Sequence, residues 1–164
     1  MKKYLSCLLF VIIISASFTR SQDKDFGLGI ILGEPTGVSL KYWTSSNTAF
    51  DGAVAWSFIN GGAFHVHADY ILHSFNLIHI ESGRLPVYYG IGGRIKFLDD
   101  AGIGVRVPVG LAYLFDDAPI DIFLEVVPIL DLAPKTNFKI NAAIGGRYFF
   151  NWFAVSLFVS NQNN

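Results

Sequence analysis

The chain has 164 residues, of which 52% are hydrophobic and 15% aromatic, and its 12 basic and 13 acidic residues give a formal net charge of −1. This balance, without a basic stripe, argues against nucleic acid as a partner. The length suits one domain. No stretch after the N-terminal region has the roughly 20 consecutive apolar residues of a spanning helix, so short β-strands must carry the hydrophobicity.

The first 21 residues have the features of a signal peptide, because two lysines precede an apolar run, Leu5 to Phe18. We expect cleavage after Ser21, with Ser17 as the alternative. The chain's single cysteine, Cys7, lies in this segment, so the mature chain has no thiol for disulfides or thiolate metal sites. Removing the segment leaves 9 basic against 13 acidic residues, a net charge of −4.

Eight strand-like runs follow, and in each the side chains alternate with a period of two. Turn signals separate the runs, such as Asn60-Gly61-Gly62, which is typical of a β-hairpin. The longest connection is Ser74 to Leu85. Pro108 and Pro128 interrupt two runs, where we expect β-bulges. The runs are 26–33, 38–43, 49–58, 64–73, 86–97, 103–115, 120–130 and 138–150.

The two faces of these runs differ in charge. In the last run the even positions carry no charge, whereas the odd positions include Lys139 and Arg147, and no run has a charge on its apolar face. A soluble ligand-binding barrel has the reverse pattern, with an apolar interior. The sequence therefore predicts an all-β fold, an eight-stranded antiparallel up-and-down transmembrane β-barrel. The charges on the opposite face are Lys41, Asp51, Asp69, Arg94, Lys96, Arg106, Asp121, Glu125, Lys139 and Arg147.

The predicted organisation is a signal peptide at 1–21, a barrel at 22–150 and a C-terminal tail at 151–164, which we expect to be peripheral to the closed barrel. An even number of strands places both termini on the periplasmic side. Aromatic residues gather at both ends of the runs, at the heights where such rings meet a membrane interface. We therefore expect the protein in the cell outer membrane, surrounded by its lipid.

The interior of an eight-stranded barrel is just wide enough for side chains to fill. Unpaired charges there are costly, so we expect an ion-pair network that plugs the lumen, centred on Arg94, Arg106 and Glu125. The expected function is structural or membrane-anchoring, with a narrow pore or a small-ligand-binding barrel as an alternative. The predicted network consists of Asp51, Asp69, Arg94, Lys96, Arg106, Asp121, Glu125, Lys139 and Arg147.

Two other kinds of site were considered on the inward face. His65, His67 and Asp69 share one face of a strand, so a metal site completed by a neighbouring strand is conceivable; solvated lumen side chains are the simpler interpretation. Ser57 and His65 lie near one hairpin end, and a lipid-modifying enzyme would use them as nucleophile and base. No flanking motif marks Ser57 as activated. We therefore predict no catalytic residue, no metal and no cofactor.

Two segments rich in glycine and aromatic residues carry a family resemblance. Tyr88-Tyr89-Gly90-Ile91-Gly92-Gly93 and the closing Gly145-x-x-Tyr148-x-Phe150 resemble the small eight-stranded outer-membrane proteins of the OmpA-membrane-domain and OmpX type, over about residues 26–150. Within that group the chain is most similar to a set of small outer-membrane barrels of unassigned activity. The shared text is GEPTG at 33–37, DGAVAWSF at 51–58 and GVRVPVGL at 104–111.

The resemblance implies an outer-membrane barrel with no assigned activity. It also implies that Gly145, Tyr148 and Phe150 form the signal that the barrel-assembly machinery reads on the last strand. The chain departs from the usual pattern because residues 151–164 follow a Phe that is normally terminal. We expect a monomer whose protein partner is that machinery, during biogenesis.

Overall fold

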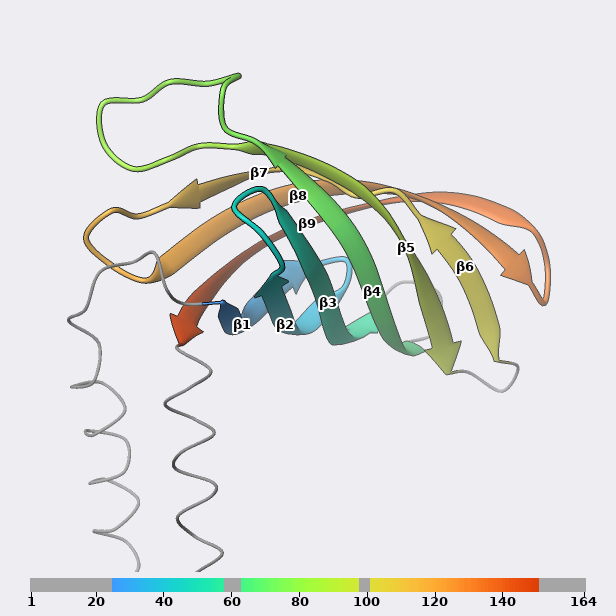
Figure 1. The fold of residues 1–164 in the computed structure, drawn as a ribbon. Coiled ribbons are helices and arrows are strands. Elements are labelled where there is room, and N and C mark those ends of the chain that lie inside the picture. The colour runs from blue at the N-terminus through green and yellow to red at the C-terminus, as the bar shows by residue number, and fades with distance from the viewer. Residues whose placement is uncertain (1–24, 58–62, 98–100, 151–164) are drawn as a thin grey trace, which may run out of the picture.

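The computed structural model describes residues 25–57, 63–97 and 101–150, which form one antiparallel sheet that closes on itself (Figure 1). The predicted signal peptide, the tail and the Asn60-Gly61-Gly62 hairpin lie outside these residues. Within them there is no helix, and so none long and apolar enough to cross a membrane. The strands are β1 (Phe26–Gly33), β2 (Thr36–Trp43), β3 (Thr48–Ser57), β4 (Ala63–Ser74), β5 (Val87–Phe97), β6 (Gly102–Arg106), β7 (Val109–Leu114), β8 (Ile120–Ala133) and β9 (Asn137–Phe150).

The sheet closes through its first and last strands. β1 pairs with β9 over its whole length, from Phe26 opposite Phe150 to Gly33 opposite Ala143. β6 and β7 both lie between β5 and β8, so together they make one interrupted wall segment. The predicted eight-stranded antiparallel up-and-down barrel is therefore confirmed. Closure pairs every strand edge, as lipid surroundings require.

The interruption falls at Pro108, which has no backbone N–H for the ladder. Its carbonyl accepts a hydrogen bond from the N–H of Gly90 at 3.0 Å. The register against β8 is the same on both sides of the break, because Arg106 lies opposite Ile129 and Val109 opposite Val126. The β-bulge predicted at Pro108 is therefore wrong: the strand is interrupted at residues 107 and 108, but no extra residue is inserted and the register is kept.

The bulge predicted at Pro128 is wrong. β8 continues through this residue, with Pro128 in register opposite Ile140 of β9. On the other side its carbonyl accepts the N–H of Val107 at 3.0 Å, so the missing donor of Pro128 does not break the wall. The shift in register lies instead between Ile103 and Gly104 of β6.

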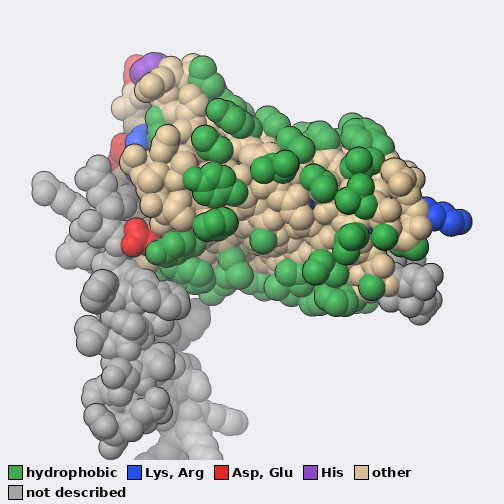
Figure 2. All heavy atoms as spheres, turned by 45° about the vertical axis from the view of Figure 1, so that its right-hand side comes forward, with side chains coloured by type: hydrophobic (Ala, Val, Ile, Leu, Met, Phe, Trp, Pro, Cys, Tyr) green, Lys and Arg blue, Asp and Glu red, His purple; other side chains and the backbone are tan. Residues whose placement is uncertain are grey.

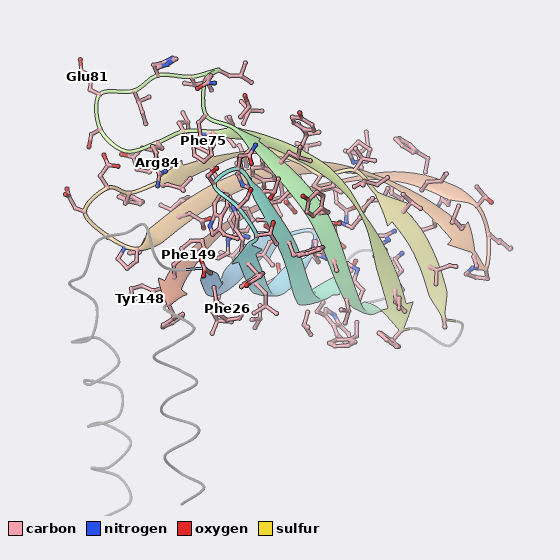
Figure 3. The ribbon with its side chains drawn as sticks, in the orientation of Figure 1. Phe26, Phe75, Glu81, Arg84, Tyr148 and Phe149 are labelled. Atoms are coloured by element: carbon pink, nitrogen blue, oxygen red, sulfur yellow. The ribbon has the colours of Figure 1, made fainter. Side chains whose placement is uncertain are left out.

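The connections differ in length between the two ends of the barrel. At the far end, away from the termini, Glu34 and Pro35 alone join β1 to β2. The longest connection, Phe75–Pro86, lies at the terminus end, where β1 begins and β9 ends (Figure 1). Its base is fixed to the β7–β8 turn, because Gly83 N donates to Asp116 Oδ2 at 2.7 Å. Figure 3 shows Glu81 at the tip of this loop and Arg84 near its base.

The wall is apolar outside and polar inside. Outward side chains such as Ile30 and Ile140 are 57% and 64% exposed. Figure 2 shows apolar side chains over the visible wall, with charged side chains at its two ends. The inward positions hold the buried charges, including Lys41 and Asp121. The alternation predicted from the sequence therefore describes the two faces correctly.

Candidate functional site in the barrel interior

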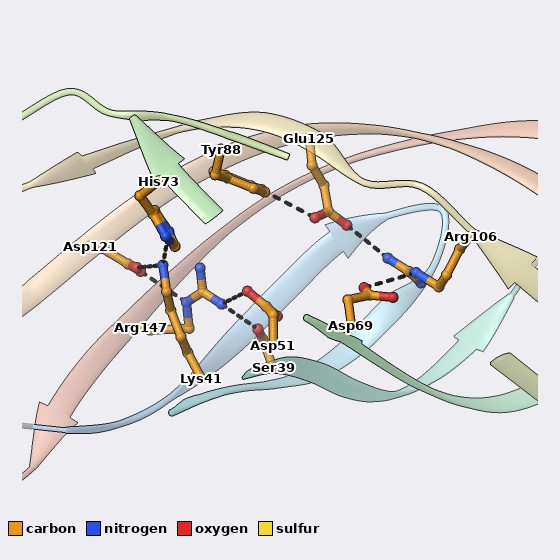
Figure 4. A network of polar contacts seen from close by, with 10 residues as sticks. All are labelled: Ser39, Lys41, Asp51, Asp69, His73, Tyr88, Arg106, Asp121, Glu125 and Arg147. Carbon is orange, nitrogen blue, oxygen red and sulfur yellow. Dashed lines mark hydrogen bonds and ion pairs between the residues drawn. The ribbon is translucent and has the colours of Figure 1, made fainter. Parts of the chain in front are cut away.

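Arg147 on β9 is the centre of the first of three groups of charges in the lumen (Figure 4). Its Nε donates to Asp121 Oδ1 at 3.0 Å, and its Nη1 donates to Asp51 Oδ2 at 2.5 Å. Lys41 Nζ lies 3.6 Å from Asp121 Oδ2. We call Lys41, Asp51, Asp121 and Arg147 the terminus-side group. It contains two cations and two carboxylates.

The strand register explains how the terminus-side group forms. Lys41 lies opposite Asp51 on the β2–β3 ladder, and Asp121 lies opposite Arg147 on the β8–β9 ladder. The bond from Arg147 to Asp51 joins the two pairs. Because β1 and β2 separate β9 from β3 around the ring, this bond crosses the lumen. The guanidinium of Arg147 also stacks 4.1 Å from the ring centroid of Phe123.

Four rings, which we call the aromatic group, lie beside the terminus-side group: Trp43, His73, Phe75 and Tyr88. Lys41 Nζ is 2.9 Å from His73 Nε2 and 4.4 Å from the ring centroid of Trp43. The His73 ring is 4.4 Å from that of Trp43 and 5.5 Å from that of Tyr88. These contacts fill the lumen toward the terminus end.

A depression of about 610 Å³ lies beyond the aromatic group, at the terminus end. The β2–β3 turn, the base of the long loop, the β7–β8 turn and the end of β9 line it. Phe75 and Arg84 contribute from the loop, with the guanidinium 5.5 Å from the ring centroid (Figure 3). The depression is thus a vestibule in front of a filled lumen.

The central group consists of Asp69, Tyr88, Arg106 and Glu125 (Figure 4). Arg106 Nε lies 2.9 Å from Asp69 Oδ2, and its Nη2 lies 3.5 Å from Glu125 Oε1. Tyr88 donates its hydroxyl to Glu125 Oε2 at 3.1 Å. The residues come from the neighbouring strands β4, β5, β6 and β8, and Asp69, Arg106 and Glu125 are 5% exposed or less, so this group fills the lumen at a second level.

The far-end group consists of Arg94, Lys96, Asp131 and Lys139. Arg94 donates to Asp131 Oδ1 from Nη2 at 2.6 Å and from Nε at 3.0 Å. Lys96 Nζ and Lys139 Nζ lie 3.5 and 3.8 Å from Asp131 Oδ2. Three cations therefore share one carboxylate.

Asp131 was not predicted as a lumen residue, because the seventh run was expected to end at residue 130. β8 extends to Ala133, and Asp131 is buried at an inward position. The signal was present, because the alternation of inward odd positions continues past Leu130. The nine residues of the predicted network all lie inside the barrel or at its mouth, but in three groups. Arg106 and Glu125 come together, whereas Arg94 pairs with Asp131 elsewhere.

The three possible metal ligands, His65, His67 and Asp69, do not converge on one point. No group of three or more His, Cys, Asp or Glu residues able to hold a metal occurs in the described part of the chain. The rings of His65 and His67 are 6.1 Å apart, and Asp69 is paired with Arg106. Both ring nitrogens of His65 and Nδ1 of His67 have no hydrogen-bond partner among the described residues.

The considered catalytic pair is likewise not hydrogen-bonded. Ser57 donates its hydroxyl to the carboxylate of Glu34. Neither nitrogen of His65 has a hydrogen-bond partner among the residues described, so it does not act as a base toward Ser57 in this arrangement. The structure therefore does not form the nucleophile–base pair of a hydrolase at this position.

The three residues of the expected assembly signal lie on both faces of β9. Gly145 faces inward, where a Cβ would overlap the ring of Phe123, so glycine makes room for that ring. Tyr148 and Phe150 lie on the outward face with their ring centroids 4.8 Å apart. The segment thus ends the wall with an aromatic pair, of which Figure 3 labels Tyr148.

No protein-family model and no curated protein matches this chain. Solved structures with the same fold include the N-terminal β-barrel domain of Pseudomonas aeruginosa OprF, with 14% identity, a TM-score of 0.55, and coverage of 78% of this chain and 98% of that domain. Neisserial surface protein A (NspA) has 15% identity and a TM-score of 0.50, with coverage of 77% and 94%. At these identities the similarity concerns the fold. It confirms that the chain has the fold of the small eight-stranded outer-membrane barrels, as the sequence resemblance implied.

Proposed function

We propose that this chain, which has the fold of small outer-membrane β-barrels, is a structural protein of the cell outer membrane whose own side chains close its lumen. The observation that carries the proposal is the bond from Arg147 to Asp51, which crosses the lumen. Arg106 and Asp69 obstruct the path at a second level. Separating buried, paired charges is costly, so the plug stays in place and the barrel serves to anchor rather than to conduct.

The outer face of the wall supports the membrane location. Its outward aromatic side chains lie toward both strand ends, where such rings meet membrane interfaces. Cell fractionation tests the location, together with gel mobility before and after boiling in detergent. We expect the outer-membrane fraction and a heat-dependent shift in mobility. Recovery in a soluble fraction would contradict the proposal. The exposed aromatic residues are Tyr42, Phe50, Trp56, Phe64, Tyr70, Tyr89, Phe97 and Phe138.

Conductance in planar bilayers tests the plug directly. We expect no steady large conductance from the unmutated protein. Arg147→Ala removes the side chain that crosses the lumen but leaves the central group in place, so we expect at most brief or small openings from this variant. Lys135→Ala is the matched control, because Lys135 is an exposed cation in the β8–β9 turn. Steady conductance from the unmutated protein would favour the narrow-pore alternative and overturn the plug.

The lipid-modifying alternative has its own test. The protein is incubated with phospholipid or lipid A, and the products are analysed. Our proposal expects the lipids to be unchanged. Conversion of lipid by the unmutated protein that Ser57→Ala abolishes would establish the enzymatic alternative instead.

We also propose that the barrel-assembly machinery recognises Gly145, Tyr148 and Phe150. The outward position of the aromatic pair at the rim of β9 supports this role. Phe150→Ala should lower the amount of heat-shifting protein in the membrane while the protein still refolds in detergent. Equal losses in cells and in detergent would assign Phe150 to the stability of the barrel instead.

A further inference from the structure

Among the described residues, positive charge at the far end of the lumen exceeds the negative charge that contacts it. Arg94, Lys96 and Lys139 all approach the single carboxylate of Asp131, at 2.6 to 3.8 Å. In the terminus-side group, by contrast, two cations contact two carboxylates. A small anion that joined the far-end group would therefore lower the repulsion among the three cations.

Two buried imidazoles lie next to these cations with unused hydrogen-bonding atoms. On the β4–β5 ladder His65 is opposite Lys96, and His67 is opposite Arg94. His65 is only 1% exposed, yet neither of its ring nitrogens has a hydrogen-bond partner among the described residues. A neutral imidazole offers one N–H donor. Buried polar groups are normally bonded, so His65 is a donor beside the cations that has no acceptor in the described part of the chain.

We propose that Lys96, Lys139, Arg94 and His65 form a binding site for a small oxyanion of the phosphate class. The side chains of Lys96 and Lys139 are 15% and 27% exposed, so the site opens to solution at the far end. The central group closes the lumen behind it, so the ion binds there and does not pass through. Three cations repel a divalent metal, which makes an anion the matching ligand for His65, whose ring nitrogens have no partner within the described ranges. The site depends on the barrel fold alone, whatever the role of the barrel in the membrane.

Phosphate titration of the folded, full-length mature protein tests the proposal. The protein is held in maltoside micelles, which carry no phosphate, and chloride keeps the ionic strength constant. Calorimetry gives the affinity, and the loss of the heat-shifted gel band gives the melting temperature. We expect phosphate to bind and to raise the melting temperature. A melting temperature equal to that in chloride, with no binding heat, would overturn the proposal.

Variants at the same end of the barrel separate a built site from general attraction. Lys96→Gln combined with Lys139→Gln should weaken phosphate binding roughly tenfold or more, because two of three cations are lost. Each single variant and His65→Gln should weaken it by a smaller factor, and the single variants serve if the double variant does not fold. Lys135→Gln, at an exposed position of the adjacent turn, should change it by less than about twofold. Equal losses from Lys135→Gln and the Lys96 variant would overturn the site.

Two further experiments test the effect of nearby acidic residues and whether the phosphate comes from solution or from a lipid. Asp99 and Asp100 follow Phe97 in the sequence and lie outside the described residues, so the titration is repeated with both changed to Asn. Phosphate should then bind at least as tightly, and a loss of binding would contradict the proposal.

Lipid A carries phosphate at the membrane surface rather than in the lumen. If lipid A stabilises the protein and the Lys96 and Lys139 substitutions abolish this, the lumenal assignment is overturned.

Discussion

The two ends of the lumen hold charge in different ways. In the terminus-side group two cations face two carboxylates, and Arg147 and Asp121 are 2% and 0% exposed. In the far-end group three cations share Asp131, and water reaches Lys139. Moving a charge out of water costs several kcal/mol unless a partner offsets it, whereas water screens an excess near the opening. The charges of the terminus-side group must therefore stay paired for the barrel to be stable. The excess positive charge of the far-end group remains able to bind a ligand.

Among the predicted variants, replacement of Arg147 should cause the largest loss in the free energy of unfolding. Arg147→Met leaves Asp121 buried with Lys41 as its remaining cation and leaves Asp51 partly buried without its ion pair, so we expect a loss of about 3 to 5 kcal/mol in the free energy of unfolding. Arg147→Lys keeps the charge and should lose less. Urea unfolding in liposomes, followed by the heat-shifted gel band, measures both. A loss below about 1 kcal/mol for Arg147→Met would show that the terminus-side group does not hold the barrel together.

The central group should give an intermediate effect. Glu125→Gln keeps the shape and an acceptor for Tyr88, and Arg106 keeps Asp69, so we expect a loss of about 1 to 2 kcal/mol. Glu81→Gln, at the exposed tip of the long loop, is the matched control and should leave stability unchanged. The same unfolding assay applies. Equal stability of Glu125→Gln and the unmutated protein would remove Glu125 from the set of stabilising contacts.

Arg94 should matter less, although its hydrogen bonds to Asp131 are short. Arg94 is itself buried, but Arg94→Gln leaves Lys96 and Lys139 beside Asp131, so this carboxylate keeps cationic partners and we expect a loss of about 1 kcal/mol. Measured beside Arg147→Met, it gives the difference between the two ends directly. Equal losses from the two variants would show that the two ends of the lumen contribute equally to stability.

Lys139→Gln should have the smallest effect. It removes one of three crowded cations at the solvent-exposed edge, so we expect a change within about 0.5 kcal/mol. At low salt the variant should be slightly more stable than the unmutated protein, and the difference should vanish as salt screens the repulsion. Stability curves at low and high salt measure this. A clear loss at low salt would show that Lys139 is needed as a partner of Asp131.

The fold was predictable from the sequence because lipid outside and polar side chains inside impose a strict alternation. Ile30 and Lys41 illustrate it, one exposed on the wall and one buried in the lumen. The β-bulges predicted at Pro108 and Pro128 were both wrong, because the register is kept at each and the proline carbonyls accept hydrogen bonds from Gly90 and Val107. Proline thus indicates a lost donor without saying whether the ladder needs it.

The partners within the lumen were not predictable to the same degree. Arg147 and Asp51 lie 96 residues apart in sequence and meet only because the ring closes with a particular stagger of its strands. Alternation gives the face of each side chain and not its height in the barrel. For that reason the sequence placed Arg94, Arg106 and Glu125 in one centre, whereas the structure assigns Arg94 to a different level. Asp131 was lost because the end of its strand was set too early.

The pairing of β1 with β9 makes the order of synthesis matter. β9 is the last part of the wall to be made, and until it arrives β1 and β8 each lack a neighbour on one side. A chain in that state has two open strand edges beside an apolar outer face, the combination that promotes aggregation. Loss of the last strand would therefore yield an open, aggregation-prone sheet rather than a smaller barrel. The cell must keep such a chain shielded until its final residues have been delivered.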